Sequence, residues 1–164
     1  MSTRVVSSHE SASGVEEVFA MLTSPQWPAR KAAELRDGSV VVEREERPGG
    51  GVRLVVSREL PSGGVPGFLE RFLPADGRVV QTDEWDPPAG GERHGRWSVS
   101  IPGAPASLGG TLLLTPTAAG SRYVVEGEVT VRVPLIGGKA EKFLGDLVVK
   151  LADKEAQLLD RALA

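Results

Sequence analysis

A single carboxylate, Glu155, interrupts an apolar stripe near the end of the chain. An α-helix over 137–163 would place it beside Leu144 and Leu151 on one face, at 100° per residue. An unpaired buried carboxylate costs several kcal/mol, so it needs a cation, a raised pKa or water. It is either a ligand-orienting or acid–base group in a cavity, or a solvated or arginine-paired group at the end of a barrel. We favour the second, with Arg58 as candidate partner, because structural ion pairs often perturb such groups.

Aromatic residues provide the other candidates for a binding site. Trp97 alternates with Val99 and Ile101 and is predicted to face inward, whereas Tyr123 would present a hydroxyl at the end of its strand. Aromatic walls with few polar tips are typical of small-molecule sites, although core packing explains each ring taken singly. The candidate pocket residues are Trp27, Arg58, Phe68, Phe72, Trp97, Tyr123, Phe143, Leu147, Leu151 and Glu155. Trp97 is the one most strongly expected to line a pocket.

Motifs for metal, nucleotide or covalent chemistry are missing from the sequence. The chain has no cysteine, and His9 and His94 stand in no metal-binding spacing, so we expect no metal and no cofactor. There is no G-x-S-x-G motif for a nucleophilic serine. Gly137-Gly138-Lys139 is followed by Ala140 rather than Ser or Thr, which argues against a phosphate-binding loop. No residue is assigned a catalytic role.

Composition limits the classes of partner. The chain has 164 residues, of which 40% are hydrophobic and 25% charged, and its formal charge is −3. Its basic residues are scattered, so no electrostatic footprint for nucleic acid exists. Neither a signal peptide nor an apolar run long enough to span a bilayer is present, so we expect a cytoplasmic protein without stable membrane insertion. The oligomeric state stays open between a monomer and a weak dimer.

The first half of the chain reads as a strand, two short helices and a hairpin. The strand covers 3–10, and a helix follows over 13–22 with Ser13 and Glu16 as a capping box. A second short helix over 29–35 is ended by Asp37-Gly38. Alternation on both sides of the turn at 48–51 predicts a hairpin. Segment 65–73 is either a helical turn or a lid-like loop.

The second half reads as a meander that ends in one long helix. Four strands over 78–86, 95–101, 108–115 and 121–133 are separated by Pro- and Gly-rich turns. The helix over 137–163 would be about 40 Å long at 1.5 Å per residue. We expect Pro134 to end ladder pairing and Gly137-Gly138 to reverse the chain, so that the helix lies inside the concavity of a twisted sheet. Residues 1–164 would then form one α+β domain.

This order of elements resembles the helix-grip superfamily, the START-like or SRPBCC proteins. The likeness is carried by the helix over 13–22 with Thr23-Ser-Pro-Gln-Trp27, the strand end over 131–136 and the helix start Gly137-Gly-Lys-Ala-Glu141. More narrowly, the chain looks like a bacterial branch of unknown function. The resemblance implies the order β-α-α-β-β-β-β-β-β-α, with a curved antiparallel sheet wrapped around the long helix and a cavity between them for an apolar ligand.

Glycines bear on that cavity in two ways. Gly127 and Gly110 interrupt the inward faces of their strands, and Gly145 thins one side of the helix. Small inward residues leave volume for a ligand, but glycines also relieve strain in a curled sheet. Both interpretations stay open.

The functional prediction is binding of a hydrophobic small molecule, such as a lipid, isoprenoid, quinone or polyketide-like compound, rather than catalysis. Binding needs only shape and apolar lining, whereas catalysis needs polar groups that the sequence does not display. One alternative is a polyketide cyclase or dehydratase that uses Glu155, Tyr123 or Arg58. The other is a protein-interaction or co-chaperone module that uses the outer face of the sheet.

Overall fold

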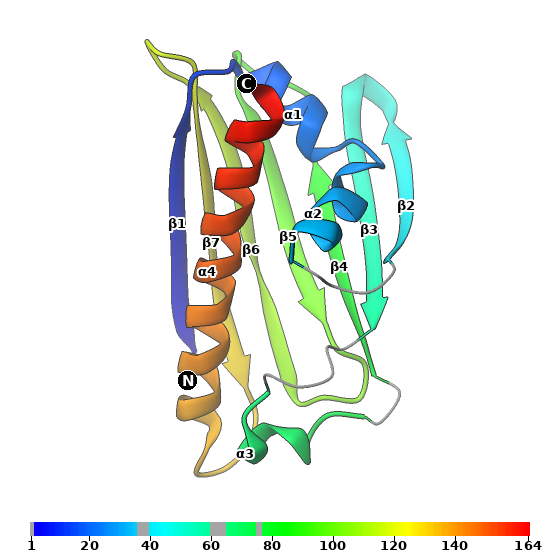
Figure 1. Cartoon of the computed structure of the whole chain (residues 1–164), viewed down its shortest axis with the longest axis vertical. Coiled ribbons are helices and arrows are strands. Elements are labelled where there is room, and N and C mark those ends of the chain that lie inside the picture. The colour runs from blue at the N-terminus through cyan, green and yellow to red at the C-terminus, as the bar shows by residue number, and fades with distance from the viewer. Residues whose placement is uncertain (1, 36–39, 60–64, 75–76) are drawn as a thin grey trace.

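Seven strands form one antiparallel sheet in the computed structural model, which describes residues 2–35, 40–59, 65–74 and 77–164 (Figure 1). The strands are β1 Thr3–Ser11, β2 Val40–Arg47, β3 Gly51–Glu59, β4 Arg78–Trp85, β5 Arg93–Ser100, β6 Ala106–Pro116 and β7 Ser121–Val131. Their order across the sheet is β1-β7-β6-β5-β4-β3-β2. Strands β2 to β7 are therefore the predicted meander, and β1 pairs with the last strand of it.

The described residues also form four α-helices and one 3₁₀ turn. They are α1 Val15–Leu22, α2 Trp27–Leu35, α3 Gly67–Glu70 and α4 Gly137–Leu163, with the 3₁₀ turn at Pro48–Gly50. The segment predicted as a helical turn or a lid is thus the short helix α3. The expected stop of the second helix at Asp37-Gly38 lies outside the described residues.

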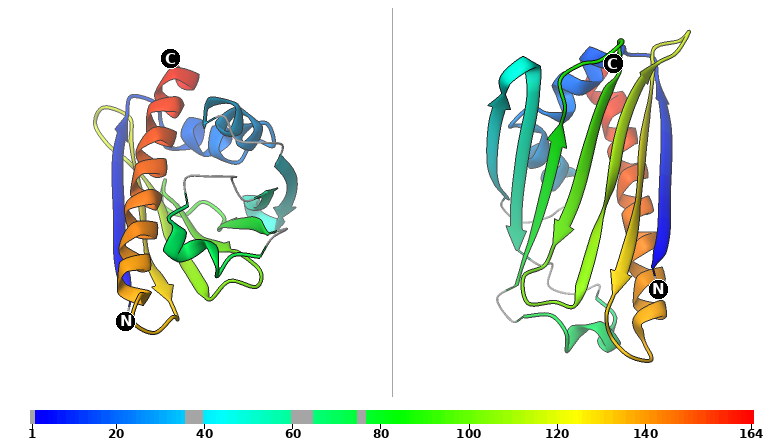
Figure 2. Two further views of the ribbon diagram at one scale, coloured as in Figure 1. Left: turned by 60° about the horizontal axis from the view of Figure 1, so that its bottom comes forward. Right: turned by 180° about the vertical axis from the view of Figure 1, so that it is seen from behind.

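The sheet curves around α4, as the helix-grip prediction requires. Helix α4 packs against β1 and β7, and α1 and α2 lie on the same side of the sheet, over its other half (Figures 1 and 2). Seen from behind, the sheet lies in front of all three helices (Figure 2). The core lies between these layers, and its fully buried side chains include Val18, Trp27, Leu114 and Val129.

The chain reversal before α4 has a different cause from the one predicted. Leu135, not a glycine, adopts the left-handed conformation, with φ at 71°. Gly137 is required for another reason, because a Cβ there would lie 2.8 Å from the carbonyl oxygen of Val131. The sequence pattern located the reversal correctly, but it assigned the unusual backbone conformation to the wrong residue.

A buried carboxylate ties the start of α4 to the sheet. Glu141 is 2% exposed and accepts a hydrogen bond from the backbone N–H of Val131 at 2.9 Å. The Thr3 hydroxyl donates to its other oxygen at 3.4 Å. Glu141 therefore joins the first turn of α4 to both β7 and β1, and no feature of the sequence distinguished it from a surface glutamate.

The start of α1 is offset by one residue from the predicted capping box. Gly14, not Ser13, is the N-cap, and its N–H donates to Oε1 of Glu17 at 3.3 Å. Glu16 is thereby free to leave the helix end and binds Arg93 of β5 with both carboxylate oxygens, at 2.9 and 2.7 Å. This ion pair connects α1 to β5 of the sheet.

No helix in the described ranges is both long enough and apolar enough to cross a bilayer.

Candidate functional site

One row of the inner face places the acidic residue Asp83 between apolar neighbours, and the row ends at Arg44 on β2. Across the strands, Asp83 pairs with Leu54 on one side and with Trp97 on the other. The row continues through Gly110 and Gly127 to the edge strand. Because side chains alternate between faces, Asp83 shares the inner face with these residues. Asp83 was not a candidate in the sequence, although its spacing of two from Trp85 could have revealed its direction.

Trp97 lies across the two glycines of this row. Its indole Nε1 donates to the carbonyl oxygen of Glu126 at 2.9 Å. A Cβ on Gly127 would come within 2.6 Å of Cζ2 of the Trp97 ring, and a Cβ on Gly110 would overlap the backbone of β7. These glycines therefore serve a close approach of ring and strand rather than an empty volume. Gly145 of α4 similarly brings that helix against β1, because a Cβ there would lie 3.3 Å from Val5.

Glu155 is half-buried and ion-paired, but its partner is a lysine. The Lys31 ammonium on α2 lies 2.5 Å from Oε2 of Glu155 on α4. The predicted type of partner, an arginine, is therefore wrong. The pair joins the two helices across the inner side of the sheet, and it was invisible in the sequence because 124 residues separate its members.

Tyr123 is surrounded by protein, yet its hydroxyl keeps accessible surface. Burial raises the pKa of Tyr123 well above its usual value, and the charges of Glu155 and Asp83 raise it further. Trp27 Nε1 is the only side-chain nitrogen or oxygen in the described part that is both buried and unpartnered. The Tyr123 hydroxyl makes no hydrogen bond there either, so its oxygen must remain accessible. Half-buried Tyr123 thus presents a neutral hydroxyl on the inner side of the sheet.

Asp83 experiences the same environment. Burial raises the pKa of its carboxyl from 3.8 to about 6, against the opposing effects of the Lys31 charge and a hydrogen bond from Gln81. The Gln81 amide donates to Oδ1 of Asp83 at 3.2 Å. Asp83 also keeps part of its surface accessible. The Asp83 carboxyl is therefore half-buried on the inner face and has lost part of its hydration.

The other predicted pocket residues lie at several places around this interior. Trp27 is the buried first residue of α2, and its ring nitrogen lacks a partner. Phe143 and Leu151 are half-buried on α4, whereas Leu147 is 38% exposed. The remaining three predicted residues are also half-buried: Arg58 on β3, Phe68 in α3 and Phe72 just after it. Lys139 lies over the Phe68 ring and Arg71 over the Phe72 ring.

Histidines and acids do not gather into a metal site among the described residues. His9 bonds Asp160 at 3.0 Å, and His94 bonds Glu92 at 3.0 Å. His9 therefore links β1 to α4, whereas the bond of His94 is local to its own segment.

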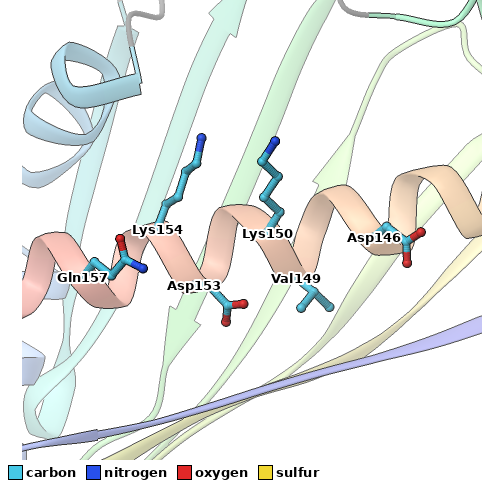
Figure 3. Close-up of a pocket in the computed structure, with 6 residues that line it drawn as sticks. All are labelled: Asp146, Val149, Lys150, Asp153, Lys154 and Gln157. Carbon is cyan, nitrogen blue, oxygen red and sulfur yellow. The ribbon is translucent and has the colours of Figure 1, made fainter.

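A shallow surface depression lies along α4, away from the inner face. It is lined by Asp146, Val149, Lys150, Asp153, Lys154 and Gln157. Figure 3 shows the two lysines extending to one side of the helix and Asp153 to the side of β1. Because all six residues come from one helix and five are polar, this depression lacks the walls that a buried small molecule needs.

Asp83→Asn is expected to stabilise the protein at pH 7.5 by about 1–3 kcal/mol. Because the folded pKa is raised, ionised Asp83 costs stability above about pH 6. The cost decreases as the pH falls from 6 towards 4, so the advantage of the variant should decrease with it. Urea unfolding of wild type and variant at pH 7.5 and at pH 4 measures this effect. Asp86→Asn is the control, since Arg96 lowers the pKa of that exposed carboxyl and the sign reverses. Equal stability of wild type and Asp83→Asn at pH 7.5 would contradict the burial of Asp83.

Sequence comparison places the chain among proteins without an assigned activity. Residues 7–163 match DUF2505, a protein family of unknown function. An uncharacterized protein of Mycobacterium tuberculosis strain H37Rv is 30% identical over 148 residues, which cover 86% of this chain and 85% of that protein. An uncharacterized protein of Mycobacterium bovis matches equally well.

Solved structures share the fold at low sequence identity. The di-domain aromatase/cyclase StfQ from the steffimycin biosynthetic pathway is 16% identical with a TM-score of 0.66, and the match covers 100% of this chain and 51% of StfQ. TTHA0849 from Thermus thermophilus is 17% identical with a TM-score of 0.64, over 98% and 97% of the two chains. Norcoclaurine synthase from Thalictrum flavum, solved with dopamine and hydroxybenzaldehyde, is 17% identical with a TM-score of 0.53, over 97% and 87%.

Proposed function

Because the chain belongs to the DUF2505 family, a bacterial branch of the START-like helix-grip superfamily, we propose that it binds a hydrophobic small molecule between its sheet and α4. The ligand classes that suit such a space are lipids, isoprenoids, quinones and polyketide-like compounds. The fold neighbours whose names state a role, StfQ and norcoclaurine synthase, act in small-molecule chemistry, which supports a small organic ligand.

The observation that carries the proposal is uneven burial along one row of the inner face. Val99, Leu108 and Val129 are paired across β5, β6 and β7 and point to the same side. Val129 is 0% exposed, whereas Val99 is only half-buried. A core packed to the usual density would bury both ends of the row. From Val99 the half-buried part of the inner face extends to Val125, Tyr123 and Asp83. We name this region the chamber. Its residues are Val56, Gln81, Asp83, Val99, Tyr123, Val125, Leu151 and Glu155.

Val99→Phe is expected to weaken ligand binding without unfolding the protein. The neutral fluorophore N-phenyl-1-naphthylamine should bind wild type at one saturable site and raise its Tm. The benzyl side chain of the Val99→Phe variant would occupy the chamber and lower the affinity for the fluorophore at least about tenfold. The free energy of unfolding should change by less than about 1.5 kcal/mol. Fluorescence titration and thermal unfolding measure the two effects.

Val129→Phe is the matched control, because Val129 lies in the same row where the core is closed. Overpacking there should lower the free energy of unfolding by about 1–3 kcal/mol. If Val99→Phe destabilises the protein as much as Val129→Phe does, no chamber exists. If wild type shows no saturable binding, the proposed function is wrong.

Catalysis is the second candidate, and one observation favours it. The pKa of Asp83, raised by burial to about 6, is suited to proton transfer near neutral pH, and Tyr123 close by remains a neutral donor. A cyclase or dehydratase would use such a pair. This role predicts turnover of a polyketide-like substrate that Asp83→Asn removes while binding persists.

A further inference from the structure

The charge balance of the chamber is negative. Lys31 carries one positive charge and is already bound by Glu155 at 2.5 Å. Asp83 adds a second carboxylate, and its hydrogen bond comes from the neutral amide of Gln81. Arg58 shares the inner face of β3, but it has an interaction of its own. Near Asp83 and Glu155 the protein therefore supplies two carboxylates and, with Lys31, one ammonium.

The Asp83 carboxylate lies on the inner face of the sheet, where a ligand bound in the chamber would contact it. Its strand neighbours across the sheet are Leu54 and Trp97, so the carboxylate projects from an apolar wall. An isolated carboxylate in such a wall is costly to bury, and a complementary group removes most of that cost. The Gln81 amide fills only part of the hydrogen-bonding capacity of the Asp83 carboxylate, because an ionised carboxylate has about four acceptor sites.

The Tyr123 hydroxyl adds a second acceptor on the same space. Its oxygen is accessible and makes no hydrogen bond to the described residues, and the charge of Asp83 is close enough to raise the pKa of Tyr123. An ammonium has three N–H donors and no acceptor. A carboxylate and a phenolic oxygen that face one cavity match this donor set, whereas an anionic ligand would be repelled.

We infer that the ligand of the chamber is an amphipathic amine whose protonated nitrogen pairs with Asp83, while its apolar body lies against Val56, Val99 and Val125. This inference rests on the proposed function, since it assumes that the chamber takes up a small molecule. It narrows the ligand from any hydrophobic compound to one with an apolar body and a single cationic end.

Two probes of the same shape test the inference. 2-(2-Naphthyl)ethylamine is a cation at pH 7.5, and 2-(2-naphthyl)ethanol is neutral. Isothermal titration calorimetry should show the amine binding wild type at least about tenfold more tightly than the alcohol, because hydrogen bonds to charged groups are stronger than neutral ones. Asp83→Asn should remove this preference and leave the affinity for the alcohol within about twofold.

The pH dependence gives an independent readout. Amine affinity should fall between pH 7.5 and pH 5 in wild type, because Asp83 becomes protonated, and should stay level in Asp83→Asn. The other inner-face groups that carry charge or titrate include Lys31 from α2, Glu141 and Glu155 from α4, Tyr123 from β7, Arg58 from β3, Arg44 and Glu46 from β2, Arg93 from β5 and His9 from β1, whose ring bonds Asp160. These groups are unchanged in Asp83→Asn, so a pH dependence that persists in the variant would not come from Asp83.

The outcomes separate the two proposals. If the alcohol binds as tightly as the amine, or if Asp83→Asn weakens both probes equally, the amine inference is wrong even though the chamber binds ligands. If both probes and N-phenyl-1-naphthylamine fail to bind, the proposed function and the inference fail together. Unfolding of Asp83→Asn is not expected to confuse the result, since removal of a buried charge should stabilise the fold.

Discussion

Gly110→Ala is expected to lower the free energy of unfolding by about 3 kcal/mol or more, and to prevent folding if the protein has little stability to spare. A Cβ at this position would lie 1.9 Å from the carbonyl oxygen of Glu126 and 2.4 Å from Cα of Gly127. Both atoms belong to the backbone of β7, so no side chain can move aside. The methyl group can be accommodated only if β6 and β7 separate where the inner face is most crowded.

Gly138→Ala is the matched control for this substitution. Gly138 lies in the first turn of α4, and a Cβ there would meet no atom within 4 Å. Alanine is the better helix former, so this variant should be neutral or stabilised by up to about 1 kcal/mol. Urea unfolding of both variants measures the difference. Comparable stability of Gly110→Ala and wild type would mean that β6 and β7 do not approach each other as described.

Arg93→Met is expected to lower the free energy of unfolding by about 2–3 kcal/mol, because the variant loses charged hydrogen bonds and a cation–π contact. The Arg93 side chain is 7% exposed and binds Glu16 of α1. It also donates to the Gly50 carbonyl at 2.9 Å and lies 3.7 Å from the centre of the Phe19 ring. Methionine fills similar space but leaves the Gly50 carbonyl without its donor. Helix α1 also loses its link to the turn between β2 and β3.

Arg96→Met provides the control on the same strand. Arg96 bonds the exposed Asp86, and pairs of that kind contribute little, so a loss below about 1 kcal/mol is expected. The pH dependence offers a second check. The hydrogen bond from Arg93 lowers the pKa of Glu16, so the pair stabilises the fold above the unfolded pKa near 4.5 and loses its effect as the pH falls below that value. That part of the pH dependence should be missing in Arg93→Met, and its persistence would assign it to other carboxylates.

The fold could be predicted because its largest signals are local. The apolar stripe over 137–163 predicted α4 with both its ends correct, and the Pro- and Gly-rich turns correctly separated the strands of the meander. Errors arose where two adjacent residues were equally suitable. Ser13 and Gly14 can both cap a helix, and in the structure Gly14 does so while Glu16 binds Arg93.

The candidate site could be predicted only in part. Alternation along the strands and the period of α4 correctly placed Trp97 and Tyr123 on the inner face and Glu155 on the inner side of its helix. Lys31 and Asp83 were missed because their importance depends on partners distant in the sequence. Lys31 looks like an ordinary surface lysine until α2 is placed beside α4, and Asp83 looks like one more polar residue in a half-exposed strand.

The pairing of β1 with β7 has a consequence for synthesis of the chain. Thr3 lies opposite Val129 in the finished sheet, so β1 leaves the ribosome well before its partner β7 and must wait for it before their ladder can form. Val5, which is buried between β7 and α4 at the end, remains uncovered throughout that interval. The strands between β1 and β7 in the chain can pair as successive hairpins while translation continues. A nascent chain paused before β7 should therefore expose its N-terminal segment to chaperones and proteases, and release of the completed polypeptide should remove that exposure.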